Sequence, residues 1–151
     1  MDGFFYNPNI QPFREHQLRR QGAFALAGAT GRRCLAPEGY DMPEFLRRVV
    51  SREQERCLLC YRMRLMRTAA FAAREGYDAF TSTLLLSIHQ DHELVRRTGK
   101  AAAREAGVEF LYRDYRPDWK LHWELTDRYG LYKQSWCGCV FSEYERYGSR
   151  R

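Results

Sequence analysis

Short apolar segments alternate along this chain with longer segments in which apolar residues recur at helical spacing. A short apolar run bounded by turn residues predicts a strand, whereas an apolar residue at every third or fourth position predicts an amphipathic helix. The predicted strands are residues 2–6, 34–36, 78–83 and 108–112. The predicted helices are residues 11–27, 42–52, 58–74, 90–106 and 119–129.

The sequence also predicts which residues anchor the first helix and where the helices begin and end. The first helix is mostly polar, and we expect its few apolar residues to anchor it to the core: Leu18, Phe24 and Leu26. Asp41 and Glu44 form the pattern of a capping box at the start of the second helix. Three other helices are followed by a glycine, which favours a left-handed C-terminal turn: Gly76, Gly107 and Gly130.

The alternation of strands and helices predicts an α/β fold built from βαβ units around a mainly parallel sheet. We find no linker or internal repeat, so a single domain is expected over residues 1–151. Ligands of such folds bind at the carboxyl ends of the strands. Three segments follow predicted strands and are therefore candidate site segments: the turn after Tyr6, residues 81–87 and residues 113–116.

The charge of the chain favours a nucleic-acid partner. The formal net charge is +6, and only three of the 25 basic residues are lysines: Lys100, Lys120 and Lys133. Arginine binds phosphates through two parallel hydrogen bonds and stacks on bases, although an excess of arginine can also reflect genomic base composition. We see neither a signal peptide nor an apolar stretch long enough to span a membrane, so a cytoplasmic protein is expected.

Cysteines supply the candidate chemistry. Five cysteines in a chain without an export signal argue against a disulfide framework. Cys57 and Cys60 form a C-x-x-C pair at the start of a predicted helix, a pattern typical of zinc, iron–sulfur or thiol redox sites. The helix N-terminus and Arg56 favour thiolates there. The alternative is ordinary core packing, because cysteine is often a small buried residue.

The second pair, Cys137 and Cys139, is separated only by Gly138. The glycine relieves backbone crowding, so the pair can chelate a metal or form a strained, labile disulfide. The two pairs together can also make a four-cysteine zinc site, but their wide separation in an α/β pattern favours redox or iron–sulfur chemistry. Cys34 is isolated and is expected to be a packing residue.

His89 and His92 lie three positions apart, so they can share a metal, but we favour a solvated helix N-terminus that Asp91 and Glu93 complement electrostatically.

Five motifs recur here in a specific order and spacing. They are Phe4-Phe5-Tyr6-Asn7-Pro8-Asn9-Ile10 with Pro12, Arg56-Cys57-x-x-Cys60-Tyr61-x-Met63-Arg64-Leu65, Phe80-Thr81-Ser82-Thr83-Leu84-Leu85-x-Ser87 with Gln90, Tyr112-Arg113-Asp114-Tyr115-Arg116, and Leu131-Tyr132-x-Gln134 to Cys137-Gly138-Cys139-x-Phe141-Ser142. In this arrangement the sequence resembles the cobalamin-independent epoxyqueuosine reductase family, QueH. The resemblance runs from Phe4 to Ser142.

The resemblance implies reduction of epoxyqueuosine to queuosine at the wobble position of tRNA, in which the epoxide oxygen is removed as water with two electrons. It implies a three-layer fold of the HUP nucleotide-binding type and a [4Fe–4S] cluster. Cys57 and Cys60 match cluster ligands of the family. Cys137 and Cys139 match a pair assigned either as a redox-active disulfide or as ligands of an additional iron. The electron donor is not indicated by the sequence.

One departure from the family concerns the N-terminus. Family members begin with a further strand that ends in adjacent cysteines, which are also metal ligands, and this sequence starts after that strand. We therefore expect an N-terminal truncation of roughly 25 to 30 residues, about one strand and one helix. Because a four-thiolate cluster needs four ligands, the chain as given is expected to hold the cluster poorly.

Arginines and one aspartate complete the expected site. Asp114 and Arg116 follow a predicted strand and are expected to line the catalytic site. Arg113, Arg62 and Arg64 are expected, with Arg116, to bind tRNA phosphates. Two alternatives stay open: a non-catalytic, zinc-stabilised tRNA-binding module, and an inactive truncated paralogue.

Overall fold

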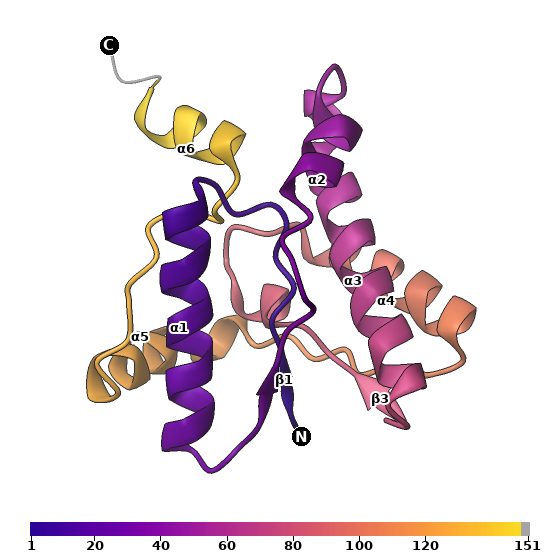
Figure 1. Cartoon of the computed structure of the whole chain (residues 1–151), viewed down its shortest axis with the longest axis vertical. Helices are drawn as coiled ribbons and strands as arrows, with labels where there is room; N and C mark the ends of the chain where they lie inside the picture. The colour runs from indigo at the N-terminus through magenta and orange to yellow at the C-terminus, as the bar shows by residue number, and fades with distance from the viewer. Residues whose placement is uncertain (149–151) are drawn as a thin grey trace. The chain divides into compact units, whose positions relative to one another are not determined.

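The computed structural model describes residues 1–148 of the chain and shows a mixed α/β protein, mostly helical with short parallel strands (Figure 1). The strands are β1 (Gly3–Phe4), β2 (Cys34–Leu35), β3 (Ala79–Phe80) and β4 (Glu109–Phe110). The α-helices are α1 (Phe13–Ala29), α2 (Met42–Val49), α3 (Arg56–Arg74), α4 (His92–Ala106), α5 (Trp119–Arg128) and α6 (Val140–Tyr147). Three 3₁₀-helices, η1 (Glu53–Glu55), η2 (Thr83–Leu86) and η3 (Arg116–Asp118), complete the elements.

Every predicted helix and strand is present at nearly its predicted place, which confirms the α/β class. The strands are shorter than predicted, each with two residues. Helix α6 was not predicted, although Val140, Phe141, Tyr144 and Tyr147 recur at helical spacing in its sequence. None of its residues is buried, so these apolar positions are not part of a core.

The strands form two separate parallel pairs in the described part of the chain. In the first, Gly3 lies opposite Cys34 and Phe4 opposite Leu35. In the second pair, of β3 with β4, Phe80 lies opposite Phe110. The parallel pairing predicted from the βαβ pattern is confirmed, but a single continuous sheet is not found among residues 1–148.

The chain divides into two compact units. The first contains residues 1–53 and 125–151, of which 149–151 lie outside the described part, and the second contains residues 54–124. Since a division into units does not decide whether a chain folds as one domain, the single domain over residues 1–151 stays a prediction.

The second unit has an apolar core in which α3 and α4 pack against each other and against β3 and β4. Its most deeply buried residues recur at helical spacing on α3 and α4, as an amphipathic pattern requires. They include Leu65 and Ala69 of α3 and Val95 and Ala102 of α4, and Leu85 of η2 is buried beside them. The ring of Phe80 packs on the ring of Phe110, with 5.1 Å between their centroids.

The first unit is organised around α1, which packs along the β1–β2 pair. Its buried residues are Glu15 and His16, whereas the expected apolar anchors are exposed: Leu18, Phe24 and Leu26. The anchor prediction was wrong because the inner face of α1 is polar. Buried polar groups are tolerated only where hydrogen bonds or ion pairs compensate their lost hydration, and Glu15 has such a partner in Arg19.

The helix ends test the capping predictions. Gly76, Gly107 and Gly130 all adopt positive φ angles at helix C-termini, as predicted. The capping box of α2 was wrong: Asp41 makes no cap hydrogen bond, because its carboxylate instead accepts one from the hydroxyl of Tyr6 at 2.8 Å.

No helix among residues 1–148 combines the length and the apolar character needed to cross a membrane.

Gly99 of α4 lies against the ring of Phe110 in the second unit, where there is no room for a side chain. A Cβ atom at this position would lie 2.3 Å from the ring of Phe110, so Gly99→Ala should force the core apart. We expect a loss of about 1–3 kcal/mol in the free energy of unfolding in spite of the better helix propensity of alanine. Urea unfolding followed by circular dichroism measures this change.

The matched control is Gly22→Ala in α1, where an added Cβ meets nothing within 4 Å. This variant should be up to about 1 kcal/mol more stable than the parent, because only the helix propensity changes. Equal effects of the two substitutions would contradict the packing at Gly99.

Candidate functional site

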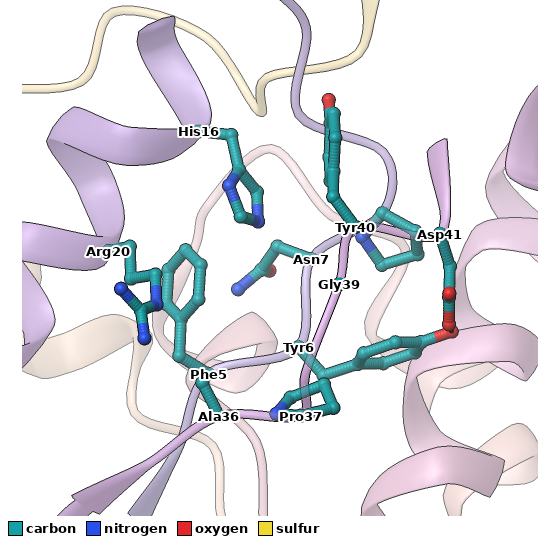
Figure 2. Close-up of a pocket in the computed structure, with 11 residues that line it drawn as sticks. Phe5, Tyr6, Asn7, His16, Arg20, Ala36, Pro37, Gly39, Tyr40 and Asp41 are labelled. Carbon is teal, nitrogen blue, oxygen red and sulfur yellow. Dashed lines mark hydrogen bonds between the residues drawn. The ribbon is translucent and has the colours of Figure 1, made fainter. Parts of the chain in front are cut away.

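A pocket of about 270 Å³, its open mouth included, lies where the β1–β2 pair ends. The residues that follow both strands line it, together with two side chains from α1 (Figure 2). They are Phe5, Tyr6, Asn7, Pro8, His16, Arg20, Ala36, Pro37, Gly39, Tyr40 and Asp41. The turn after Tyr6, which was predicted to be a site segment because it follows a strand, contributes Asn7 and Pro8 to this lining.

His16 is the most deeply buried polar side chain of the pocket, with 6% of its surface exposed. Its ring lies between that of Tyr40, at 4.3 Å between centroids, and that of Phe5, at 5.2 Å. The Nδ1 atom is buried and has no hydrogen-bond partner. Burial, and secondarily the charge of Arg20, lowers the pKa of His16, so the ring is neutral at neutral pH.

The two phenols of the pocket use their hydroxyls elsewhere. The hydroxyl of Tyr40 donates to the carbonyl of Ile10, and that of Tyr6 donates to Asp41. Burial raises the pKa of Tyr40, which keeps this donor protonated. Their rings therefore wall the pocket, while the polar groups that face it come from His16, Arg20 and Asn7 (Figure 2).

The segment after β1 also holds the second cysteine pair. The side-chain amide of Asn9 donates to the carbonyl of Cys137 at 3.3 Å, and the backbone N–H of Gln11 donates to the carbonyl of Gly138 at 2.8 Å. The side-chain oxygen of Gln11 in turn accepts a hydrogen bond from the N–H of Val140. Cys137 and Cys139 are thus placed by the residues that directly follow the pocket-lining Asn7 and Pro8.

Gly138 fits this position for two reasons. Its φ angle is +101°, which L side chains rarely adopt, and a Cβ atom would lie 2.6 Å from Cγ1 of Ile10. The neighbours differ in exposure: Cys137 is exposed, whereas Cys139 is buried at the N-cap position of α6, where its side chain makes no cap hydrogen bond.

A buried ion pair fixes the approach to this cysteine segment. Arg19 pairs with Glu15 at 2.7 Å, and both side chains are 7% exposed. The same guanidinium donates to Gln134 and to the carbonyl of Trp136, while Glu15 also accepts from the hydroxyl of Tyr132. Because each charged group has several partners, the network compensates the cost of burial.

The first cysteine pair belongs to the other unit. Cys57 and Cys60 lie in the first turns of α3, three positions apart and therefore on one face of the helix. Cys57 is exposed, Cys60 is half-buried, and the neighbouring Tyr61 is anchored by a hydrogen bond to Gln90. Within residues 1–148 no three histidine, cysteine or acidic side chains gather closely enough to hold a metal. Among the described residues the pair thus offers two thiols, not a full ligand set.

Asp114 lies in the loop that follows β4 and is tied to Arg116. The Arg116 guanidinium donates to both carboxylate oxygens and its backbone N–H donates to one of them. These hydrogen bonds, those of the side chain first, hold the pKa of Asp114 well below its usual range. Asp114 is therefore ionised at neutral pH, and Arg116 already has a carboxylate partner.

The other predicted arginines and histidines are also in the second unit. Arg62 and Arg113 are exposed and Arg64 is half-buried, with the Arg113 guanidinium over the ring of Tyr115 at 5.1 Å. His89 is exposed as expected, but His92 is buried, with Nδ1 3.9 Å from Asp114. The solvated helix start was therefore wrong for His92.

Known proteins match the chain over most of its length. The sequence model described as "Epoxyqueuosine reductase QueH" matches residues 1–145. A protein of that name from Dehalococcoides mccartyi is 41% identical over 145 residues, which cover 96% of this chain and 80% of the relative. One from Thermotoga maritima is 31% identical over 153 residues, 95% of this chain and 79% of the relative. The chain belongs to the QueH family.

The match of this QueH chain includes both cysteine pairs and the pocket. Sequence reasoning missed the pocket residues His16, Arg20 and Tyr40. One signal could have pointed to two of them: the predicted first helix, which contains His16 and Arg20, is mostly polar, and its polar face had no assigned role.

Gly138 provides a test of the cysteine segment. Gly138→Ala places a side chain at a φ of +101° and against Ile10, so we expect a stability loss of roughly 2–4 kcal/mol and a displaced cysteine pair. Thermal unfolding and the rate of thiol modification at Cys137 measure the two effects. Gly130→Ala is the control, since its φ is +58° with no atom near the added Cβ. It should lose only about 1 kcal/mol.

The ion pair of Asp114 predicts a pH effect. Its folded pKa is depressed, so its stabilising contribution is present above the pKa of an unfolded aspartate and is lost as the pH falls toward the folded value. Arg116→Gln should raise the pKa of Asp114 toward the usual range, as measured by carboxyl-carbon NMR titration. Arg113→Gln removes a nearby charge that does not bond Asp114 and should change that pKa much less. Equal shifts would contradict the pairing.

Proposed function

We propose that this chain reduces epoxyqueuosine to queuosine in tRNA. The observation that carries the proposal is the family match over residues 1–145, which spans both cysteine pairs, together with relatives that are named epoxyqueuosine reductases. The activity makes the chain an oxidoreductase. The three-layer HUP-type arrangement, which the resemblance implies, stays a prediction.

Cys137 and Cys139 are the proposed two-electron donors. Reduction of the epoxide to an alkene requires two electrons and two protons and releases the oxygen as water. Oxidation of two thiols to one disulfide supplies both electrons and both protons, so the reaction balances, and an external donor then reduces the disulfide. The exposed Cys137, the buried Cys139 and the intervening Gly138 support this role. In the alternative arrangement the two sulfurs bind an additional iron instead.

Cys57 and Cys60 are the proposed ligands of a [4Fe–4S] cluster. Their place at the N-terminus of α3, with Arg56 beside them, favours thiolates, the form that binds iron. When bound, such a cluster supplies electrons one at a time. Two thiolates are half of a four-cysteine ligand set, so the proposal requires further ligands beside this pair.

The proposed tRNA contacts rest on charge. The net charge of +6 favours binding to a phosphate backbone, and Arg62 and Arg113 offer exposed guanidinium groups. Arg64 is half-buried, and Arg116 shares its charge with Asp114, so both should contribute less. Asp114, ionised and half-buried, is the proposed acidic group of the catalytic site.

Single cysteine variants test the proposal. Anaerobically purified protein should convert epoxyqueuosine in tRNA when given a chemical reductant. Cys137→Ser and Cys139→Ser should lower turnover to background, because neither can form the disulfide or a complete iron site. Cys57→Ala should also lower the visible absorbance of bound iron–sulfur cluster. Mass spectrometry of the digested tRNA and the absorption spectrum are the measurements.

The control is Cys34→Ser, because Cys34 is half-buried within β2 and lies in neither pair. This variant should retain activity and colour. A Cys57→Ala protein with full absorbance and activity would show that the ligand assignment is wrong. A colourless protein that holds stoichiometric zinc and binds tRNA without turnover would instead identify a binding module.

A further inference from the structure

The pocket beside β1 contains a polar group without a function in the fold. His16 is more than nine-tenths buried, and its Nδ1 has no hydrogen-bond partner in a unit where the neighbouring Glu15 and Arg19 are fully paired. Such an atom is costly to bury and calls for an explanation such as a bound ligand. Because His16 lines the pocket, a ligand there can supply the missing partner.

The polar groups of the pocket restrict the chemistry of that ligand. Arg20 offers only donors, the amide of Asn7 offers donors and an acceptor, and the neutral ring of His16 has one nitrogen of each kind. An isolated anion needs only donors and would favour a protonated histidine, whereas burial and Arg20 lower the pKa of His16. The mixed set suits a neutral ligand with both donors and acceptors along one edge.

The apolar walls further restrict the ligand. The aromatic residues Phe5, Tyr6 and Tyr40 line the same pocket, and the phenol hydroxyls are already bonded within the unit. Aromatic walls around a mixed hydrogen-bonding edge are how proteins hold a nucleobase that has been turned out of its stack.

We infer that this pocket binds the heterocyclic base of a single RNA nucleotide turned out of its stack, and that His16 Nδ1 hydrogen-bonds the base. The inference rests on the proposed function, which makes a wobble nucleoside the substrate. The inference adds a base-binding subsite to that function. Helix α1 and the residues after β1 and β2 form this subsite, and it contains none of the cysteines.

The backbone connects this subsite to the second cysteine pair. Asn7 and Pro8 line the pocket, and the next residues, Asn9 and Gln11, hold Cys137 and Gly138 by hydrogen bonds. Residues 7–11 therefore contact both the proposed base-binding pocket and the segment of the proposed redox pair. All of these residues belong to the same compact unit.

The experiment measures binding without turnover. Fluorescence anisotropy gives the affinity of the full chain for three anticodon stem-loop RNAs, which carry epoxyqueuosine, guanosine or an abasic site at the wobble position. We expect the epoxyqueuosine RNA to bind roughly ten-fold or more tightly than the abasic RNA, a modest hydrogen-bonding and stacking effect. His16→Phe should reduce this ratio to near one while the abasic RNA keeps its affinity, because phosphate contacts are unchanged.

Two further variants separate recognition from folding. His16→Asn places an amide nitrogen close to the position of Nδ1 and should restore most of the preference. Asn7→Ala removes a second polar group of the pocket and should weaken the preference even if His16→Phe fails to fold. His89→Phe is the matched control, because His89 is an exposed histidine of the other unit, and it should leave the ratio unchanged.

The outcomes distinguish the subsite from the enzymatic proposal. A wild-type preference that His16→Phe and Asn7→Ala leave intact overturns the subsite, even if the protein turns over epoxyqueuosine. A preference that depends on His16 in a protein without any turnover supports the subsite and counts against the reductase. Free guanosine monophosphate that binds through His16 without competing with the RNA would identify a free-nucleotide pocket and overturn the proposed RNA source.

Discussion

The Cys137–Cys139 segment is held by hydrogen bonds from the chain that directly follows β1. Asn9 is bonded to Cys137, 128 positions away in sequence, and Gln11 is bonded to Gly138. These bonds require a close approach of two backbones, and that approach is possible because Gly138 carries no Cβ where Ile10 lies. The position of the proposed redox pair therefore depends on one glycine and one turn.

The inner face of α1 is polar, and its polar side chains have two kinds of neighbour. On one side of that face, Glu15 and Arg19 form the buried pair that fixes the segment before the cysteines. On the other, His16 and Arg20 face the pocket. An apolar face would pack the helix equally well, but it would offer neither a bonded network nor hydrogen-bonding groups for a ligand.

The two units present their cysteines in different settings. Cys57 and Cys60 lie at the start of α3, whose inner face from Tyr61 to Ala72 belongs to an apolar core shared with α4 and the β3–β4 pair. Cys137 and Cys139 lie in a loop that is secured by hydrogen bonds from Asn9 and Gln11. A rigid helix suits the fixed geometry of the proposed metal ligands, whereas a loop suits the proposed redox pair, whose sulfurs would change their bonding during the reaction.

The sequence by itself determined the α/β class, the place of nearly every helix and strand and the membership of the two cysteine pairs in one family motif set. Helical periodicity, glycine stops and motif spacing are local properties, so they are readable without coordinates. Only the tertiary structure decided that Leu18, Phe24 and Leu26 face solvent, that Asp41 bonds Tyr6 instead of capping α2, and that His16 is buried with an unused nitrogen. Each of these depends on contacts between distant segments, and a polar helix face carries no mark that tells whether water or another part of the chain will cover it.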